Sequence, residues 1–155
     1  MPPHSDKAEY RFLTVPGASL HLRLVPRTPG PLELQVFGNR AGVLSLANVL
    51  LWLAANAWRR EFLSLAELPF AEVEPPASVG LRVTAEEGTG RDGSLTLSDR
   101  GEQLEWVFAE DDLRRVALLI HRLASCPAHQ YDRLQLADGS VAEVQVRMTD
   151  AADWL

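Results

Sequence analysis

Residues 37–54 read FGNRAGVLSLANVLLWLA, and this stretch contains the strongest structural signal in the chain. Asn39 is a residue type favoured as a helix N-cap, and the side chains that follow are mostly apolar. The pattern predicts a long helix from about Ala41 to Arg60, which could extend to Leu65. At 100° per residue, nearly every face of this helix carries Val, Leu or Ala. We therefore expect it to be covered on more than one side, by a sheet and by a second helix or another chain.

One stripe of this helix is polar and is a candidate partner-binding surface. It consists of Ser45, Asn48, Trp52, Asn56 and Arg59. Tryptophan and arginine are over-represented at binding hot spots, so Trp52 at the centre of a polar stripe suits recognition of a partner. The alternative is a packing role, in which the Pro75-Pro76 segment covers Trp52 and its indole N–H is bonded locally.

Apolar residues alternate with polar ones in three short runs before this helix. The runs are Tyr10–Val15, Leu20–Leu24 and Leu32–Val36, separated by turn residues rich in Pro and Gly. A period of two residues is the signature of a half-buried strand. We predict three antiparallel strands here.

The second half of the chain repeats this kind of pattern. Three further strands are predicted around Val79–Val83, Leu95–Leu97 and Leu104–Phe108. A second helix begins at Glu110-Asp111-Asp112, where negative charge complements the helix dipole, and ends at Pro127. Its apolar stripe is Leu113, Val116, Ala117, Ile120, Leu123 and Ala124. A closing hairpin is predicted from Tyr131–Leu136 and Val141–Met148, turned by Asp138-Gly139.

The resulting element order is βββα-βββα-ββ, which indicates an α+β fold. We expect antiparallel strands, in one or two sheets, packed on two helices. Residues 1–8 are predicted to be a disordered tail and residues 9–155 a single domain, since 155 residues is a common size for one domain. The order resembles two similar halves plus a hairpin, but whether the halves are related is open at the level of sequence.

Composition excludes several classes of function. The formal net charge is −6, which disfavours binding to nucleic acid and to anionic membranes. The single cysteine, Cys126, cannot form an internal disulfide, and residues 1–7 do not resemble a signal sequence. We expect a cytoplasmic protein.

No motif points to catalysis, a cofactor or a metal. Gly88, Gly90 and Gly93 match G-x-G-x-x-G, but the residues that follow have a strand pattern, whereas a dinucleotide site needs a helix there. The four histidines are scattered, without metal-ligand spacing, and the carboxylates show no acid/base pair. We therefore predict no catalytic, cofactor-binding or metal-binding residues.

Residues 37–54 resemble the opening of small bacterial immunity proteins of polymorphic toxin systems. In that family a strand ends in G-N-x-x-G, and a helix of the form L-x-x-L-A-x-x-L-L-x-L-A follows. Ser78–Val83 is similar to a later strand, so the resemblance spans about residues 37–83. The family's His-bearing strand is absent, because Phe62 and Ser64 stand where a His is expected. The resemblance implies a protein that neutralises a toxin by binding it, without catalysis of its own.

Three hypotheses follow. The first is a protein-binding module, immunity-like, which contacts its partner through the Trp52 stripe or through an acidic edge at residues 102–112. The second is a structural or regulatory homo-oligomer, such as a homodimer, formed through the apolar helix 41–60. The third is an enzyme with a dispersed site, which would need a deep pocket with His121 and carboxylates converging in it.

Overall fold

The structure is a computed structural model that describes residues 10–26, 32–56, 62–74, 78–84, 86–97, 103–126, 131–137 and 139–149. Within these residues the α-helices are α2 (Arg40–Ala55) and α3 (Glu110–Ala124), and the 3-10 helices are η1 (Arg11–Leu13) and η2 (Leu65–Glu67). The strands are β1 (Leu20–Val25), β2 (Leu32–Gly38), β3 (Phe62–Ser64), β4 (Ala71–Val73), β5 (Val79–Thr84), β6 (Ser94–Leu97), β7 (Leu104–Ala109), β8 (Tyr131–Arg133) and β9 (Ala142–Met148). The predicted α+β class is confirmed. The predicted tail, residues 1–8, lies outside the described residues.

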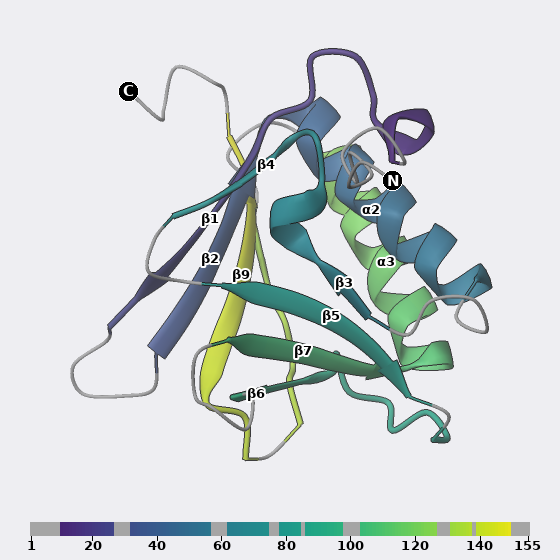
Figure 1. Ribbon diagram of the computed structural model, residues 1–155, viewed down its shortest axis with the longest axis vertical. Coiled ribbons are helices and arrows are strands. Elements are labelled where there is room, and N and C mark those ends of the chain that lie inside the picture. The colour runs from purple at the N-terminus through teal and green to yellow at the C-terminus, as the bar shows by residue number, and fades with distance from the viewer. Residues whose placement is uncertain are drawn as a thin grey trace, which may run out of the picture.

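The strands form two sheets, and α2 and α3 lie side by side on one side of the molecule (Figure 1). The strand orders are β4-β1-β2-β9-β8 and β3-β5-β7-β6. The antiparallel pairing expected of β1 with β2 and of the closing hairpin, β8 with β9, is confirmed, although β8 ends at Arg133 and not at Leu136. The prediction of antiparallel pairing throughout is wrong, because β1–β4, β2–β9 and β5–β7 pair in parallel. Alternating sequence indicates which face of a strand is buried, but it does not indicate which neighbour the strand meets.

The chain contains an internal repeat of a ββαββ unit. The first unit is β1, β2, α2, β3 and β5, and the second is β6, β7, α3, β8 and β9. In each unit the strand before the helix pairs in parallel with the last strand of the other unit, β2 with β9 and β7 with β5. Each last strand also pairs with the first strand after its own helix, β9 with β8 and β5 with β3. The two units therefore exchange strands, and β4 is an addition at one sheet edge.

The buried faces of the two helices correspond residue by residue. Val43, Ala47 and Leu50 of α2 are fully buried, and the residues at the same chain spacing in α3 are Leu113, Ala117 and Ile120, also fully buried. All the residues of the predicted apolar stripe of α3 are buried. The likeness of the two halves is thus present in both topology and packing.

The start of α2 is fixed by its N-cap. The Asn39 Oδ1 accepts hydrogen bonds from the backbone N–H groups of Gly42 (2.7 Å) and Ser19 (3.1 Å), and its Nδ2 donates to the Gly17 carbonyl (2.9 Å). The cap therefore also holds the loop that leads into β1. A Cβ at Gly42 would lie 2.0 Å from the Ser19 carbonyl oxygen, so only glycine allows this close approach.

Two predicted elements differ from the structure. Tyr10–Val15 is not a strand: it contains the 3-10 turn η1, with Tyr10 buried and Phe12 exposed. The alternation of Tyr10 and Phe12 reflects contact with α2, described below, and not a place in a sheet. The expected helix end at Arg60 or Leu65 is also wrong, because α2 ends at Ala55 with Asn56 as its C-cap.

Residues 62–64, which follow α2, form β3 because they pair with β5. Leu63 lies opposite Leu81 in the antiparallel β3–β5 pair, and both side chains are fully buried. Burial in this pair outweighs continuation of the helical pattern. The three-residue strands β3 and β4 were not predicted, since runs this short have no clear period.

The buried apolar residues form one cluster that includes side chains from both sheets and both helices. Trp106, Tyr10 and Phe108 are the largest fully buried side chains. One continuous core agrees with the predicted single domain. Within the described residues, no helix has the length and apolar character needed to cross a membrane.

Candidate protein-binding surface

Ser45, Asn48 and Trp52 of the predicted polar stripe contact the segment Tyr10–Val15. Ser45 is fully buried. Its hydroxyl donates to the Ala41 carbonyl (2.7 Å) and accepts from the backbone N–H of Val15 (2.8 Å). Its polar atom is therefore satisfied inside the protein, and a partner could reach it only by displacing the segment.

Asn48 and Asn56 also bond within the chain. The Asn48 Nδ2 donates to the Leu13 carbonyl (3.1 Å), which ties η1 to the middle of α2. The Asn56 Nδ2 donates to the Trp52 carbonyl (2.8 Å) at the end of the helix. Arg59 lies outside the described residues. The structure thus brings Ser45, Asn48 and Trp52 together as an anchor for the N-terminal segment.

Trp52 packs edge-on against two aromatic rings of that segment. Its ring centroid is 5.7 Å from that of Tyr10 and 6.2 Å from that of Phe12, with interplanar angles of 83° and 73°. Such edge-to-face contacts are favourable geometries for aromatic pairs. Trp52 is half-buried, and Tyr10 and Phe12 contact it. The residues suggested to cover it, Pro75-Pro76, lie outside the described residues.

An exposed apolar surface remains beside these contacts. Phe12 is 68% exposed, although its ring rests on Trp52. The solvent-facing arc of α2 carries mainly apolar side chains that are only partly covered: Ala41, Leu44, Leu51, Trp52 and Ala55. We call Phe12, Trp52, Leu44, Leu51 and Ala55 the aromatic face. It shares Trp52 with the predicted stripe, and sequence reasoning missed its other members, Phe12 because that residue was assigned to a strand.

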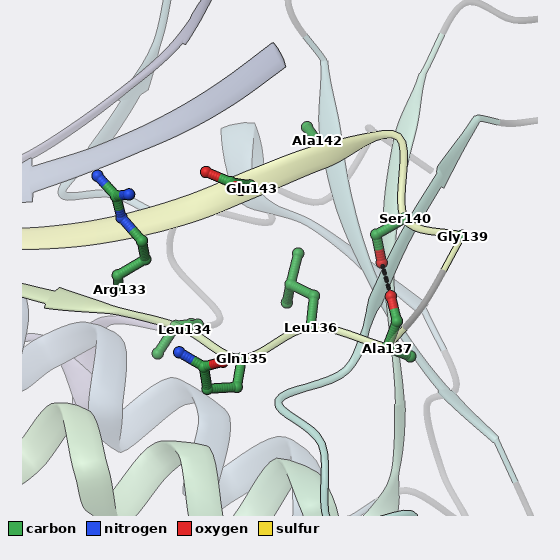
Figure 2. A pocket seen from close by; sticks show the side chains of 9 residues that line it. All are labelled: Arg133, Leu134, Gln135, Leu136, Ala137, Gly139, Ser140, Ala142 and Glu143. Carbon is green, nitrogen blue, oxygen red and sulfur yellow. Dashed lines mark hydrogen bonds between the residues drawn. The ribbon is translucent and has the colours of Figure 1, made fainter. Parts of the chain in front are cut away.

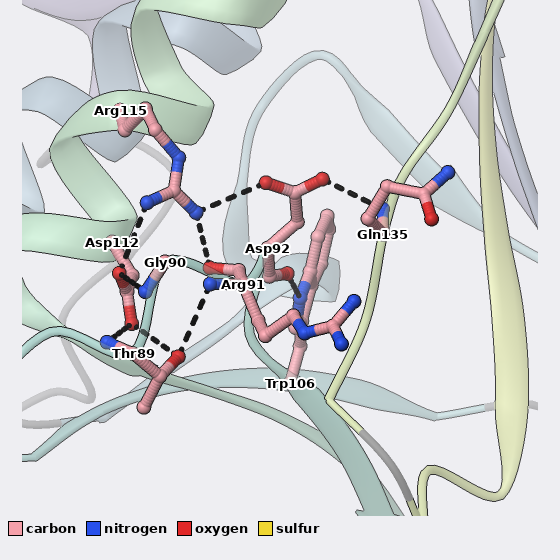
Figure 3. Close-up of polar contacts among 8 residues, drawn as sticks. All are labelled: Thr89, Gly90, Arg91, Asp92, Trp106, Asp112, Arg115 and Gln135. Atoms are coloured by element: carbon pink, nitrogen blue, oxygen red, sulfur yellow. Dashed lines mark hydrogen bonds and ion pairs between the residues drawn. The ribbon is translucent and has the colours of Figure 1, made fainter.

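A second site that sequence reasoning missed is a polar network at the start of α3 (Figure 3). The Asp112 carboxylate is 2% exposed and accepts hydrogen bonds from the Thr89 N–H (2.8 Å), the Thr89 hydroxyl (2.9 Å) and the Gly90 N–H (3.1 Å). Arg115 pairs with the same carboxylate at 3.1 Å. Burial alone would raise the pKa of Asp112, but the bonds from Thr89, Gly90 and Arg115 lower it below its usual value.

Asp92 extends the network to Gln135, which follows β8 of one sheet, and to Trp106 in β7 of the other sheet. Arg115 donates to the Asp92 carboxylate (3.1 Å) and to the Arg91 carbonyl. The Asp92 carboxylate also accepts from the Gln135 N–H (2.7 Å), and its backbone carbonyl accepts from the indole N–H of Trp106 (2.9 Å). Every polar group named here is bonded within the protein, so the geometry suits fixing loop 88–93 and not chemistry. The glycine-rich motif lies in this loop and leads into β6, as predicted.

A pocket of about 270 Å³ lies beside the chain that connects β8 to β9 (Figure 2). It is lined by Arg133, Leu134, Gln135, Leu136, Ala137, Gly139, Ser140, Ala142 and Glu143. The Ser140 hydroxyl donates to the Ala137 carbonyl (2.8 Å) and accepts from the Leu95 N–H (3.2 Å). The serine is thus engaged on both sides and is not poised as a nucleophile. Gly139 has φ of 85°, which the predicted turn requires, while Asp138 lies outside the described residues.

The histidines that the structure describes do not converge on a pocket. His121 is exposed on α3 and does not line the pocket of Figure 2. His21 lies on the outer side of β1, with its Nε2 3.2 Å from Glu74 and its Nδ1 3.9 Å from Glu72. Among the described residues, no group of three or more His, Cys, Asp and Glu side chains could hold a metal ion.

No protein-family model matches this sequence, and no curated protein and no solved structure matches it significantly.

Proposed function

We propose that this chain is a protein-binding module without catalytic activity, and that it contacts its partner through the aromatic face. The observation that carries the proposal is Phe12, an aromatic ring that is 68% exposed yet held against Trp52. Ordered aromatic side chains lose little conformational entropy on binding and are over-represented among hot spots. The neighbouring Leu44 and Leu51 extend the apolar area that a partner could cover.

We propose further that the partner is a toxin domain and that the complex forms in the cytoplasm. This step is supported by the resemblance of residues 37–54 to immunity proteins and by the net charge of −6, which suits a basic partner. The segment that carries the resemblance is α2 with its capped start, which is also the element that presents the aromatic face.

Calorimetric titration against a toxin domain encoded beside this gene tests the proposal. Replacing an exposed hot-spot ring should remove most of the affinity, so Phe12→Ser should weaken binding by about tenfold or more. The matched control is Leu97→Ser, because Leu97 is 54% exposed and lies on β6, away from the aromatic face. Equal affinity of Phe12→Ser and wild type would overturn the assignment of the face, and absence of any binding would count against the toxin.

The second candidate function is a homo-oligomer formed through the same face of α2. The partly exposed Leu44, Leu51 and Ala55 favour it, since an isologous contact would bury these residues in both copies of the chain. Light scattering across a dilution series separates the two candidates. A dimer that Phe12→Ser converts to a monomer would assign the face to self-association, whereas a monomer at all concentrations leaves it open for a different partner.

A further inference from the structure

We propose that the exposed side of α3 is a second docking surface, and that it takes a short acidic peptide segment with an aromatic side chain, presented by a partner protein. The proposal concerns a different surface from the aromatic face and does not depend on it. It follows from the internal repeat, because the chain itself shows what the equivalent surface of α2 holds.

Within the repeat, three stripe residues of α2 each correspond to one residue of α3. Counted from the corresponding buried residues Val43 and Leu113, the equivalents of Ser45, Asn48 and Trp52 are Arg115, Leu118 and Arg122. We call these three residues of α3 the α3 row. Successive members of each row lie three or four positions apart, so each row follows one side of its helix.

Each row begins with a side chain that bonds the backbone of a segment leading into a hairpin, although one accepts the hydrogen bond and the other donates it. On α2, Ser45 bonds the N–H of Val15, in the segment that leads into β1. On α3, Arg115 bonds the carbonyl of Arg91, in the loop that leads into β6. Beyond this point the two surfaces differ.

On α2 the rest of the row is covered by the chain's own aromatic segment. Asn48 bonds the Leu13 carbonyl, and Trp52 contacts Tyr10 and Phe12. On α3 the equivalent positions are open, since Leu118 is 55% exposed and Arg122 is exposed. Leu118, at the place of Asn48, and Arg122, at the place of Trp52, are therefore exposed in the row whose counterpart on α2 holds a short aromatic segment.

The charge around Leu118 specifies the occupant. Its neighbours one turn away on either side are Arg114, Arg115, His121 and Arg122, and none of them is acidic. Arg114 pairs with Glu110 (3.2 Å), and Arg115 pairs with Asp112 and Asp92, whereas no ion pair joins Arg122 to another described residue. Three arginines thus surround the exposed leucine, and Arg122, which has no ion pair with a described residue, favours an acidic ligand even in a chain of net charge −6.

The test is a titration of the isotope-labelled full chain with a synthetic hexapeptide, followed by NMR. The probe has the sequence of Tyr10–Val15 with Arg11→Glu and Thr14→Glu, so that it keeps the aromatic spacing and becomes acidic. We expect shifts of the backbone amides of residues 114–122 that saturate at roughly millimolar peptide or below. Added salt should weaken binding, because the contacts are exposed charges.

Matched variants make the result decisive. Leu118→Ser should raise the apparent Kd by about tenfold, since the peptide ring loses its apolar contact. Leu97→Ser, which removes an equally exposed leucine elsewhere, should leave it unchanged. A peptide with lysine at the two altered positions should cause no shifts on α3. Shifts on another surface, equal binding by Leu118→Ser, or equal binding of the basic peptide would each overturn the proposal, and none of these results depends on Phe12 or on the toxin.

Discussion

Asp112 shows how one buried charge holds two distant parts of the chain together. Its carboxylate accepts bonds from Thr89 and Gly90, which precede β6, while its own backbone begins α3. Asn39 does the same in the other unit, where it caps α2 and holds Ser19 before β1. At both positions a short polar side chain at a helix start fixes the loop that leads into a hairpin.

At the residue scale we predict that Asp112 makes stability depend on pH in the acid range. Its pKa is lowered in the folded state, so it stabilises the fold above about pH 4, where the unfolded carboxyl is ionised. This contribution is lost as the pH falls through the lowered folded pKa. Asp112→Ala should cost about 2 kcal/mol in the free energy of unfolding at neutral pH.

Urea unfolding of wild type and variant at a series of pH values checks this prediction. The difference between the two proteins should shrink toward acid pH. The control is Asp111→Ala, since Asp111 is the exposed neighbour in the same helical turn. A difference that stays constant from neutral to acid pH would show that the carboxylate charge does not stabilise the fold.

At the element scale, the N-terminal segment and α2 form one unit. The segment makes no ladder with a described strand, and its position is set by contacts with Ser45, Asn48 and Trp52. Its two aromatic residues have opposite roles, because Tyr10 is fully buried and Phe12 is 68% exposed. Alternation along this segment therefore separates the core from the surface without any sheet.

We predict that substitutions of these two rings differ strongly in their effect on stability. Tyr10→Ala should cost about 3 kcal/mol or more, because it empties a filled site in the core. Phe12→Ala should cost about 1 kcal/mol or less, since it loses mainly one aromatic contact. Denaturant unfolding measures both, and hydrogen exchange at the Val15 amide reports whether the segment stays docked. Equal losses for the two variants would mean that the segment is not seated as described.

The outer faces of the two helices differ more than their buried faces. α3 is amphipathic, and its buried face is the one that the sequence indicates. α2 is apolar nearly all round because it contacts α3, β2 and the N-terminal segment. This explains why the width of its apolar arc alone did not require a second copy of the chain.

At the scale of the whole molecule, the exchange of strands ties the two units into one. Each sheet contains strands of both units, through the β2–β9 and β7–β5 pairs. Backbone bonds also join the sheets, from Ala137 to Gly93 (2.9 Å) and from Val141 to Leu95 (2.9 Å). Separation of the two units would therefore break strand pairing in both sheets.

We therefore predict a single cooperative unfolding transition. The indole of the fully buried Trp106 is bonded to Asp92, and α2 and α3 supply most of the helical signal. Tryptophan fluorescence and far-ultraviolet circular dichroism should give coincident denaturant curves, as two-state folding requires. The variants that weaken one unit, Asp112→Ala and Tyr10→Ala, should shift both curves together. Two separated transitions would show that the repeats fold as independent units.

Much of the local structure was predictable from the residues. The cap at Asn39, the buried stripe of α3 and the alternation in β1, β2, β5 and β7 follow from short-range rules of capping and periodicity. These rules act within a few residues, so the sequence alone determines them. Ser45, Asn48, Trp52 and Asn56 lie along α2 and at its C-cap as expected, and their role in partner binding stays a prediction.

Tertiary structure decided what those elements meet. Strand direction, the exchange between units, the end of α2 at Ala55 and the burial of Ser45 under Val15 all depend on segments far apart in the chain. A local pattern states that a surface must be covered, but only the packed fold determines which segment covers it. For the same reason only the structure identifies Leu118 as a candidate contact residue. Leu118 is exposed on α3, whereas the N-terminal segment covers the corresponding row of α2, and this difference arises only when the two units pack together.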